Sequence, residues 1–136
     1  MRKILIVLLL IIVACGATFY FLYNKPHRNP ASEKGIRISS KELFDQFSKD
    51  EVTSNTQYLD KVLEVSGKVL EIEENQNQTT VIILETNDPI FGVRCTMNSK
   101  VAIDIADFVT VKGICTGYLS DVVLTNASLT KNDKHE

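Results

Sequence analysis

The feature that most limits what this chain can fold into is an uninterrupted apolar run near its N-terminus. The twenty residues from Ile4 to Tyr23 contain no charged side chain. A helix of that length rises roughly 30 Å, at about 1.5 Å per residue, which matches the hydrocarbon core of a bilayer. We therefore expect Ile4–Tyr23 to form one membrane-spanning helix, with the soluble part of the chain starting at Asn24.

Two other interpretations of this segment remain open. Met1–Lys3 followed by an apolar stretch also suits a cleaved signal peptide. Ile12–Cys15 resembles a bacterial lipobox, in which Cys15 would carry the lipid. In both cases the chain after Cys15 should turn polar. Gly16–Tyr23 instead stays apolar and ends in an aromatic cluster, which is typical of a helix that meets the membrane interface. An uncleaved anchor is therefore the preferred interpretation.

The charges on the two sides of this segment give little preference for its orientation. Before it lie the amino terminus, Arg2 and Lys3, and after it lie Lys25, Arg28, Lys34 and Arg37. The positive-inside rule compares these two sides, and the comparison is close to a tie. A very short basic tail before an apolar segment is typical of a signal anchor. We therefore expect a single-pass protein whose domain lies outside the cytoplasm, on the periplasmic side of the inner membrane.

The remaining chain divides into a linker, a domain and a tail. Asn24–Arg37 contains two prolines, one glycine and mixed charges, which predicts a linker able to hold the domain some tens of Å from the membrane. The predicted organisation is an anchor over residues 1–23, a linker over 24–37, a domain over 38–130 and a polar tail over 131–136.

A short helical segment opens the domain. Ser39, followed three residues later by Glu42, forms a capping box that marks a helix start. Leu43, Phe44 and Phe47 then recur at helical spacing and predict a buried stripe. The helical pattern breaks over residues 48–50 and resumes over 51–59, where the side chains expected to face the core are Val52, Tyr58 and Leu59.

From Lys61 onward the hydrophobic period changes to two, which is the period of β-strands. The strands are expected over residues 61–73, 79–86, 90–97, 108–116 and 122–129. The only long connector, 98–107, lies between the third and the fourth, and Gly67 would let the long first strand bend. Five strands in this order predict an all-β OB-fold barrel, with a short helical segment before it and one transmembrane helix at the N-terminus.

Three stretches of the chain carry a resemblance to a known family. Residues 58–69, 91–95 and 111–124, together with the anchor and the residues that follow it to Asn29, resemble the tRNA_anti-like OB-fold proteins. These are mostly small membrane-anchored bacterial proteins, many of them from Bacteroidota. The resemblance covers nearly the whole chain and implies the OB-fold. It implies no substrate and no catalytic residue, because the family name records a likeness of fold to anticodon-binding domains.

The residue types needed for common catalytic or metal sites are scarce. The only two histidines are His27 in the linker and His135 in the tail, where no folded pocket would orient them. Cys–His and Ser–His–Asp catalysis are therefore excluded, and a zinc site is not expected. We predict a protein that is not an enzyme and has no catalytic residues, no metal site and no cofactor.

Cys95 and Cys115 are both expected to point into the barrel, from the third and fourth predicted strands. Two interpretations stay open. Both can be small buried thiols, as cysteine often is. They can also form a disulfide across the core, if the domain faces an oxidising compartment. A redox-active pair is disfavoured, because the sequence has no Cys-x-x-Cys motif.

Candidate ligand-binding residues come from the face that OB-folds often use, along the second and third strands and the adjoining loops. They are Lys68, Arg94, Lys112 and Tyr118, opposed by Glu71, Glu73, Glu85 and Asp88. The whole chain has 15 Lys and Arg, and without Arg2 and Lys3 the soluble part has 13 against 17 Asp and Glu, a net charge of −4. That charge argues against general nucleic-acid binding.

We therefore predict a membrane-anchored binding module for an envelope protein, peptide or glycan. Its ligand is expected across the face that bears Arg94 and the loop Gly117–Asp121. One alternative is an OB domain that binds single-stranded nucleic acid at the membrane. The other is a structural subunit of a membrane complex.

Overall fold

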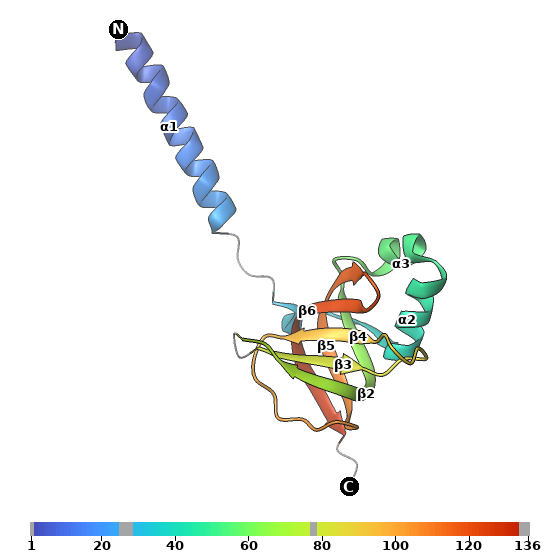
Figure 1. The fold of residues 1–136 in the computed structure, drawn as a ribbon. Helices are drawn as coiled ribbons and strands as arrows, with labels where there is room; N and C mark the ends of the chain where they lie inside the picture. Colours follow the sequence, from blue (N-terminus) through green and yellow to red (C-terminus); the bar gives the residue numbers. More distant parts are fainter. Residues whose placement is uncertain (1, 25–28, 77–78, 134–136) are drawn as a thin grey trace.

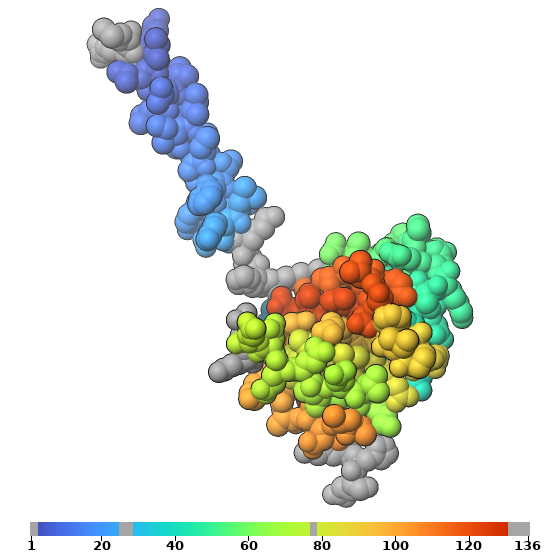
Figure 2. Space-filling view, in the orientation of Figure 1, coloured from blue at the N-terminus to red at the C-terminus, as the bar shows by residue number. Residues whose placement is uncertain are grey.

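The computed structural model describes residues 2–24, 29–76 and 79–133. Its first element is helix α1, Arg2–Tyr23, whose side chains from Lys3 onward are all exposed (Figure 2). Lys3–Tyr23 has a mean hydropathy of 2.8 and is long and apolar enough to cross a membrane. The predicted apolar N-terminal helix is therefore confirmed, although a signal sequence would have the same length and composition.

Five strands close into a barrel (Figure 1). They are β2 (Val62–Glu74), β3 (Thr80–Leu84), β4 (Val93–Met97), β5 (Phe108–Tyr118) and β6 (Val122–Asp133). Around the barrel the order is β2–β3–β4–β6–β5, and β5 pairs with β2 to close it. These neighbours are antiparallel except for β4 and β6, which are parallel. This is the strand order of an OB-fold, so the predicted fold class is confirmed.

The long strand β2 takes part in both sides of the barrel. Val62–Lys68 pair with β5, whereas the residues from Val69 to Glu74 pair with β3, and the register shifts between Val69 and Glu71. This irregularity lies where β2 passes from pairing with β5 to pairing with β3. Gly67 has another role, because a Cβ there would lie 2.9 Å from the Cβ of Ser40. A glycine is needed at this position so that the helix that begins at Ser40 can rest on the strand.

Two helices, α2 (Ser40–Lys49) and α3 (Glu51–Tyr58), lie beside the barrel (Figure 1). The side chain of Ser39 accepts a hydrogen bond from the Glu42 N–H, so the predicted helix start is confirmed. Buried helix residues are Leu43, Phe44, Phe47 and Tyr58, and they join the barrel interior in one core. The prediction that Val52 and Leu59 face the core is wrong, because Val52 is 78% exposed and Leu59 is also exposed.

The N-terminal side of the domain begins earlier than the predicted boundary. A 3-10 turn, η1 (Pro30–Ser32), buries Pro30 and contacts β5 and β6. Strand β1 (Ile36–Ser39) then pairs in parallel with the first half of β2. Pro30–Ser32, Ile36 and Arg37, all within the segment assigned to a linker, thus contact the barrel, and the part of that segment at residues 25–28 lies outside the described residues.

Several strand ends differ from the predicted ones. β3 ends at Leu84, two residues before the predicted end, and β5 continues two residues further, to Tyr118. β4 begins at Val93 rather than at Ile90, and both Ile90 and Phe91 are exposed in the preceding loop. Val93, Cys95 and Met97 are buried, as the alternation predicts. β6 continues to Asp133, into the predicted tail, and residues 134–136 lie outside the described part of the chain.

Candidate functional site

The outer face of β1, β2 and β5 brings polar side chains from distant parts of the chain into rows. Arg37 on β1 is opposite Glu64 on β2, and Glu64 is opposite Lys112 on β5. One step along the sheet, Ser66 on β2 is opposite Thr110 on β5. Residues on one face of a strand alternate with period two, so these positions all point away from the core.

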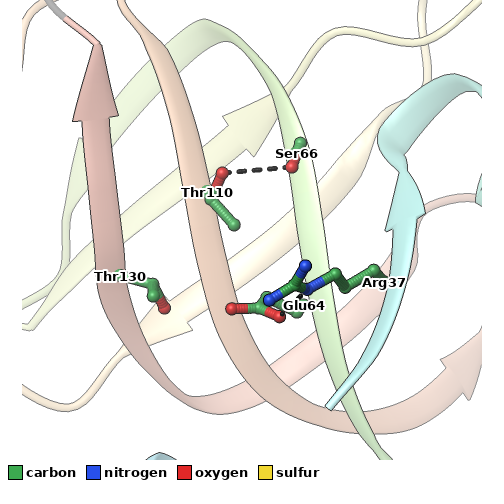
Figure 3. Close-up of a pocket in the computed structure, with 5 residues that line it drawn as sticks. All are labelled: Arg37, Glu64, Ser66, Thr110 and Thr130. Carbon is green, nitrogen blue, oxygen red and sulfur yellow. Dashed lines mark hydrogen bonds and ion pairs between the residues drawn. The ribbon is translucent and has the colours of Figure 1, made fainter.

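A groove follows β2 across this face. Its middle part has a volume of about 410 Å³ and is lined by Arg37, Glu64, Ser66, Thr110 and Thr130 (Figure 3). A second part, of about 510 Å³, is lined by Lys34, Gly35, Arg37, Glu64 and Lys112. A third part, of about 280 Å³, is lined by Ser39, Ser40, Lys41, Ser66, Gly67, Lys68, Glu85 and Phe108. The first and second parts share Arg37 and Glu64, and the first and third share Ser66. We therefore treat the three parts as one groove, the β2 groove.

The middle of the β2 groove is held by two side-chain contacts, which Figure 3 shows. The Nε of Arg37 donates to Glu64 Oε2 at 3.0 Å, and the hydroxyls of Ser66 and Thr110 are hydrogen-bonded at 3.0 Å. The Arg37 side chain is 88% exposed, so its guanidinium lies over the groove in contact with solvent. This part of the groove therefore presents a cation, a carboxylate and hydroxyls side by side.

The end of the β2 groove near α2 is built on the N-terminus of that helix. The Ser40 hydroxyl donates to the Glu85 carbonyl oxygen at 2.6 Å, and Lys41 Nζ lies 3.3 Å from Glu85 Oε1. Lys68 is exposed beside Phe108, whose ring is 42% exposed. This end combines a free ammonium group with an accessible aromatic surface.

The charges along the β2 groove are unequal. Both of its carboxylates form ion pairs, Glu64 with Arg37 and Glu85 with Lys41. The remaining cations are Lys34, Lys68 and Lys112, and none of them forms an ion pair within the part of the chain that the structure describes. Lys112 Nζ donates to the carbonyl oxygen of Ala31 at 3.2 Å, which holds η1 but leaves its charge uncompensated. The groove is thus cationic on a domain whose overall charge is negative.

Arg94, one of the predicted ligand-binding residues, lies on the other side of the barrel and is occupied by internal partners. Its Nη1 lies 2.9 Å from Glu73 Oε2, and its Nε lies 3.6 Å from Asp121 Oδ2. The hydrogen bond that Arg94 donates to Glu73 raises the pKa of Arg94. Desolvation opposes this shift, and the charges of Glu73 and Asp121 add to it. Asp121 also accepts the Gly92 N–H at 2.8 Å. Arg94 therefore ties β4 to β2 and to the β5–β6 loop.

Tyr118 is half-buried and serves mainly in packing. Its ring stacks on Phe47 at a centroid distance of 5.7 Å and meets Phe44 edge-on at 5.9 Å. It also lines a hollow of about 370 Å³ between α3 and the β5–β6 loop, together with Asn55 and the exposed Leu119. The ring is therefore not displayed as the exposed contact surface suggested by the sequence.

The two buried cysteines are free thiols in this structure. Cys95 on β4 and Cys115 on β5 both pair with Leu124, so β6 runs between them. Two interstrand spacings amount to about 10 Å, more than the roughly 7 Å limit for the Cα atoms of a disulfide. This register disfavours the disulfide hypothesis, which stays a prediction. Burial raises the pKa of Cys95 to about 12 and also raises the pKa of Cys115.

The structure thus separates the four predicted ligand-binding residues. Lys68 and Lys112 lie along the β2 groove, whereas Arg94 and Tyr118 lie elsewhere. The alternation in β2 and β5 already indicated that Ser66 and Thr110 point outward, although it did not single them out. Arg37 was missed because it falls in the predicted linker, and only the pairing of β1 with β2 brings it to this face.

Within the described residues there is no cluster of three or more His, Cys, Asp or Glu side chains that could hold a metal ion. Both histidines, His27 and His135, lie outside those ranges.

Comparison with known proteins identifies one family. The tRNA_anti-like family profile matches residues 1–129, a range that includes α1 and reaches into β6. No curated protein sequence matches the chain.

Proposed function

The chain belongs to the tRNA_anti-like family, and on that premise we propose that it is a membrane-anchored, non-enzymatic binding module. Its β2 groove binds a partner in the cell envelope: a protein, a peptide or a glycan. The observation that carries this proposal is the row of three adjoining polar hollows along β2 that make up the β2 groove, because an OB-type barrel is consistent with a binding role.

The location of the groove departs from the face first expected to bind the ligand. Arg94 is engaged by Glu73 and Asp121, so a ligand there would have to compete with two carboxylates. In the β2 groove, Lys34, Lys68 and Lys112 have no such competitors among the described residues. A charged group that lacks an internal partner gains more from a ligand than one that must first break an ion pair.

We propose further that α1 remains attached and that the barrel lies outside the cytoplasm. An apolar segment that continues past Cys15 to an aromatic cluster supports the anchor. Protease treatment of spheroplasts that carry a C-terminally tagged full-length chain tests the orientation. Loss of the tag before lysis is expected, and a tag that survives until the membrane is broken would place the barrel in the cytoplasm.

Site-specific photocrosslinking in cells tests the binding role. A benzophenone side chain at Ser66 reports on the β2 groove, and the same group at Thr96, which points outward from β4, serves as the control. Benzophenone reacts with C–H bonds of proteins, peptides and glycans alike. We expect a crosslinked species from position 66 that is absent from position 96. Equal crosslinking from both positions, or none from position 66, contradicts the proposal.

A further inference from the structure

We propose that the ligand of the β2 groove is an acidic glycan, a chain of sugars that carries spaced carboxylate or phosphate groups. This inference rests on the proposed function and names the class of partner that the groove takes. Its three supports are the uncompensated charge of the groove, the separation of its cations and the kind of polar and aromatic groups between them.

The charge of the groove selects an anion. Its two carboxylates are neutralised by Arg37 and Lys41, at 3.0 and 3.3 Å. Lys34, Lys68 and Lys112 remain, and their ammonium groups attract an anionic ligand even though the soluble part of the chain is acidic overall. Concave cationic surfaces concentrate anions by this means.

The cations lie at the two ends of the groove. Lys112 is opposite Glu64 on β2, and Lys68 is four residues further along the same strand. At about 3.3 Å per residue, the β2 position opposite Lys112 and the position of Lys68 are roughly 13 Å apart. A single headgroup-sized anion does not span that distance, whereas an extended chain with acidic groups on separate units does.

The surface between the cations suits sugars. The hydroxyls of Ser66, Thr110 and Thr130 both donate and accept hydrogen bonds, and the Glu64 carboxylate accepts them. Phe108, at the Lys68 end, offers an exposed ring against which the apolar face of a sugar can pack. A pocket with a few oriented polar groups and one accessible ring has the composition of a selective ligand site.

Two other polyanions fit the groove less well. Nucleic acid carries a phosphate on every residue and binds through several stacked aromatic rings, whereas the groove holds two carboxylates and one accessible ring. Anionic lipid headgroups are the second such polyanion, because a membrane-spanning α1 would hold the domain near them. The spread of the cations nevertheless favours a chain over a headgroup.

Binding of the full-length chain, held in nanodiscs of zwitterionic lipid, to defined probes tests this inference. The probes are an alginate oligosaccharide, neutral dextran of matched size, oligo(dT), poly-glutamate and vesicles containing phosphatidylglycerol. The variant is Lys34→Gln/Lys68→Gln, and the control is Lys49→Gln/Lys100→Gln, which makes the same change in net charge away from the groove.

We expect alginate to bind and dextran not to bind. The groove variant should bind alginate roughly tenfold more weakly, while the control stays within about twofold of the wild type. Raising NaCl from about 0.05 to about 0.5 M should weaken binding, because screening shortens the reach of the lysine charges.

Several results would overturn the inference. If dextran bound as tightly as alginate, charge would not select the ligand. If oligo(dT), poly-glutamate or the anionic vesicles bound more tightly than alginate, the ligand would belong to that class and not to the acidic glycans. Failure of every probe, with the crosslink from position 66 intact, refutes the acidic glycan but leaves the binding module standing. Failure of every probe together with loss of that crosslink refutes both.

Discussion

The two sides of the barrel each carry an arginine–glutamate pair of nearly the same length, yet the pairs differ in what surrounds them. Arg37 and Glu64 are 3.0 Å apart across β1 and β2, and Arg94 and Glu73 are 2.9 Å apart across β4 and β2. The Arg37 side chain is 88% exposed and has one carboxylate partner, whereas that of Arg94 is 35% exposed and has a second partner in Asp121. The difference shows that two ion pairs of nearly equal length can differ in exposure and in their number of partners.

The difference follows from what each pair joins. Arg94 connects β4, β2 and the β5–β6 loop, and Asp121 in that loop also binds the Gly92 N–H. Arg37 connects only β1 to β2, over the middle of the groove. We refer to these as the braced side and the groove side. Changes on the braced side should therefore act on stability. On the groove side, changes to exposed side chains should act mainly on binding, whereas a change at the buried Gly67 should act on stability.

The largest expected effect is a loss of stability at Gly67 of β2, on the groove side, where the N-terminus of α2 rests on the strand. In Gly67→Ala the new Cβ would lie 2.9 Å from Ser40 Cβ and 3.3 Å from Leu84 Cβ, so α2 must move. We expect the free energy of unfolding to fall by about 1–3 kcal/mol, measured by denaturant titration of the full-length chain in detergent. Gly16→Ala, which meets nothing within 4 Å, is the control. An unchanged unfolding midpoint for Gly67→Ala would show that α2 does not rest on β2 as described.

The next largest effect is a pH dependence of stability, contributed by the buried Cys95 on β4 of the braced side. The Cys95 thiol has its pKa raised by burial from 9.0 to about 12. Its contribution to stability is therefore complete below pH 9 and is lost as the pH rises toward 12, at up to about 1.4 kcal/mol per unit. The advantage of the wild type over Cys95→Ala should shrink by about 1 kcal/mol between pH 9 and 10, and Cys15→Ala should not change it. A constant difference would contradict the buried thiol and would leave room for the disulfide.

A smaller effect is expected from breaking the brace. Arg94→Ala removes the partner of both Glu73 and Asp121, and a networked pair at the surface contributes about 1 kcal/mol. Amide hydrogen exchange at Gly92 should also become faster, because Asp121 loses its positive neighbour. Alginate binding should stay within about twofold of the wild type. A large loss of alginate binding in Arg94→Ala would indicate that the ligand binds on the braced side instead of in the β2 groove.

The smallest effect on stability is expected at the matching arginine of the groove. Arg37→Ala breaks one exposed pair, so we expect a loss of at most about 0.5 kcal/mol. Alginate binding should nevertheless weaken, by roughly threefold, because the guanidinium lies over the middle of the groove. Arg37→Lys, which keeps the charge, should restore part of that binding. A stability loss equal to that of Arg94→Ala would remove the distinction between the two sides.

Local sequence pattern was enough to predict most of the fold. The apolar run Ile4–Tyr23, the capping box at Ser39 and the period-two alternation after Lys61 each act over a few residues, so each could be interpreted without knowing the rest of the chain. The same alternation correctly placed Val93, Cys95 and Met97 in the core. The helical pattern over residues 51–59 failed for Val52 and Leu59, because exposure at a helix end depends on which neighbours cover it.

Only the tertiary structure decided where the candidate site lies. The β2 groove depends on Arg37, Ser66 and Thr110 meeting across strands far apart in sequence, and register between such strands is set by the packing of the whole barrel. The same is true of Arg94, whose partners come from β2 and the β5–β6 loop. The sequence by itself determined the anchor-like helix and the order of an OB barrel, because these follow from local periodicity. Which charges are neutralised and which stay free followed from contacts between distant residues.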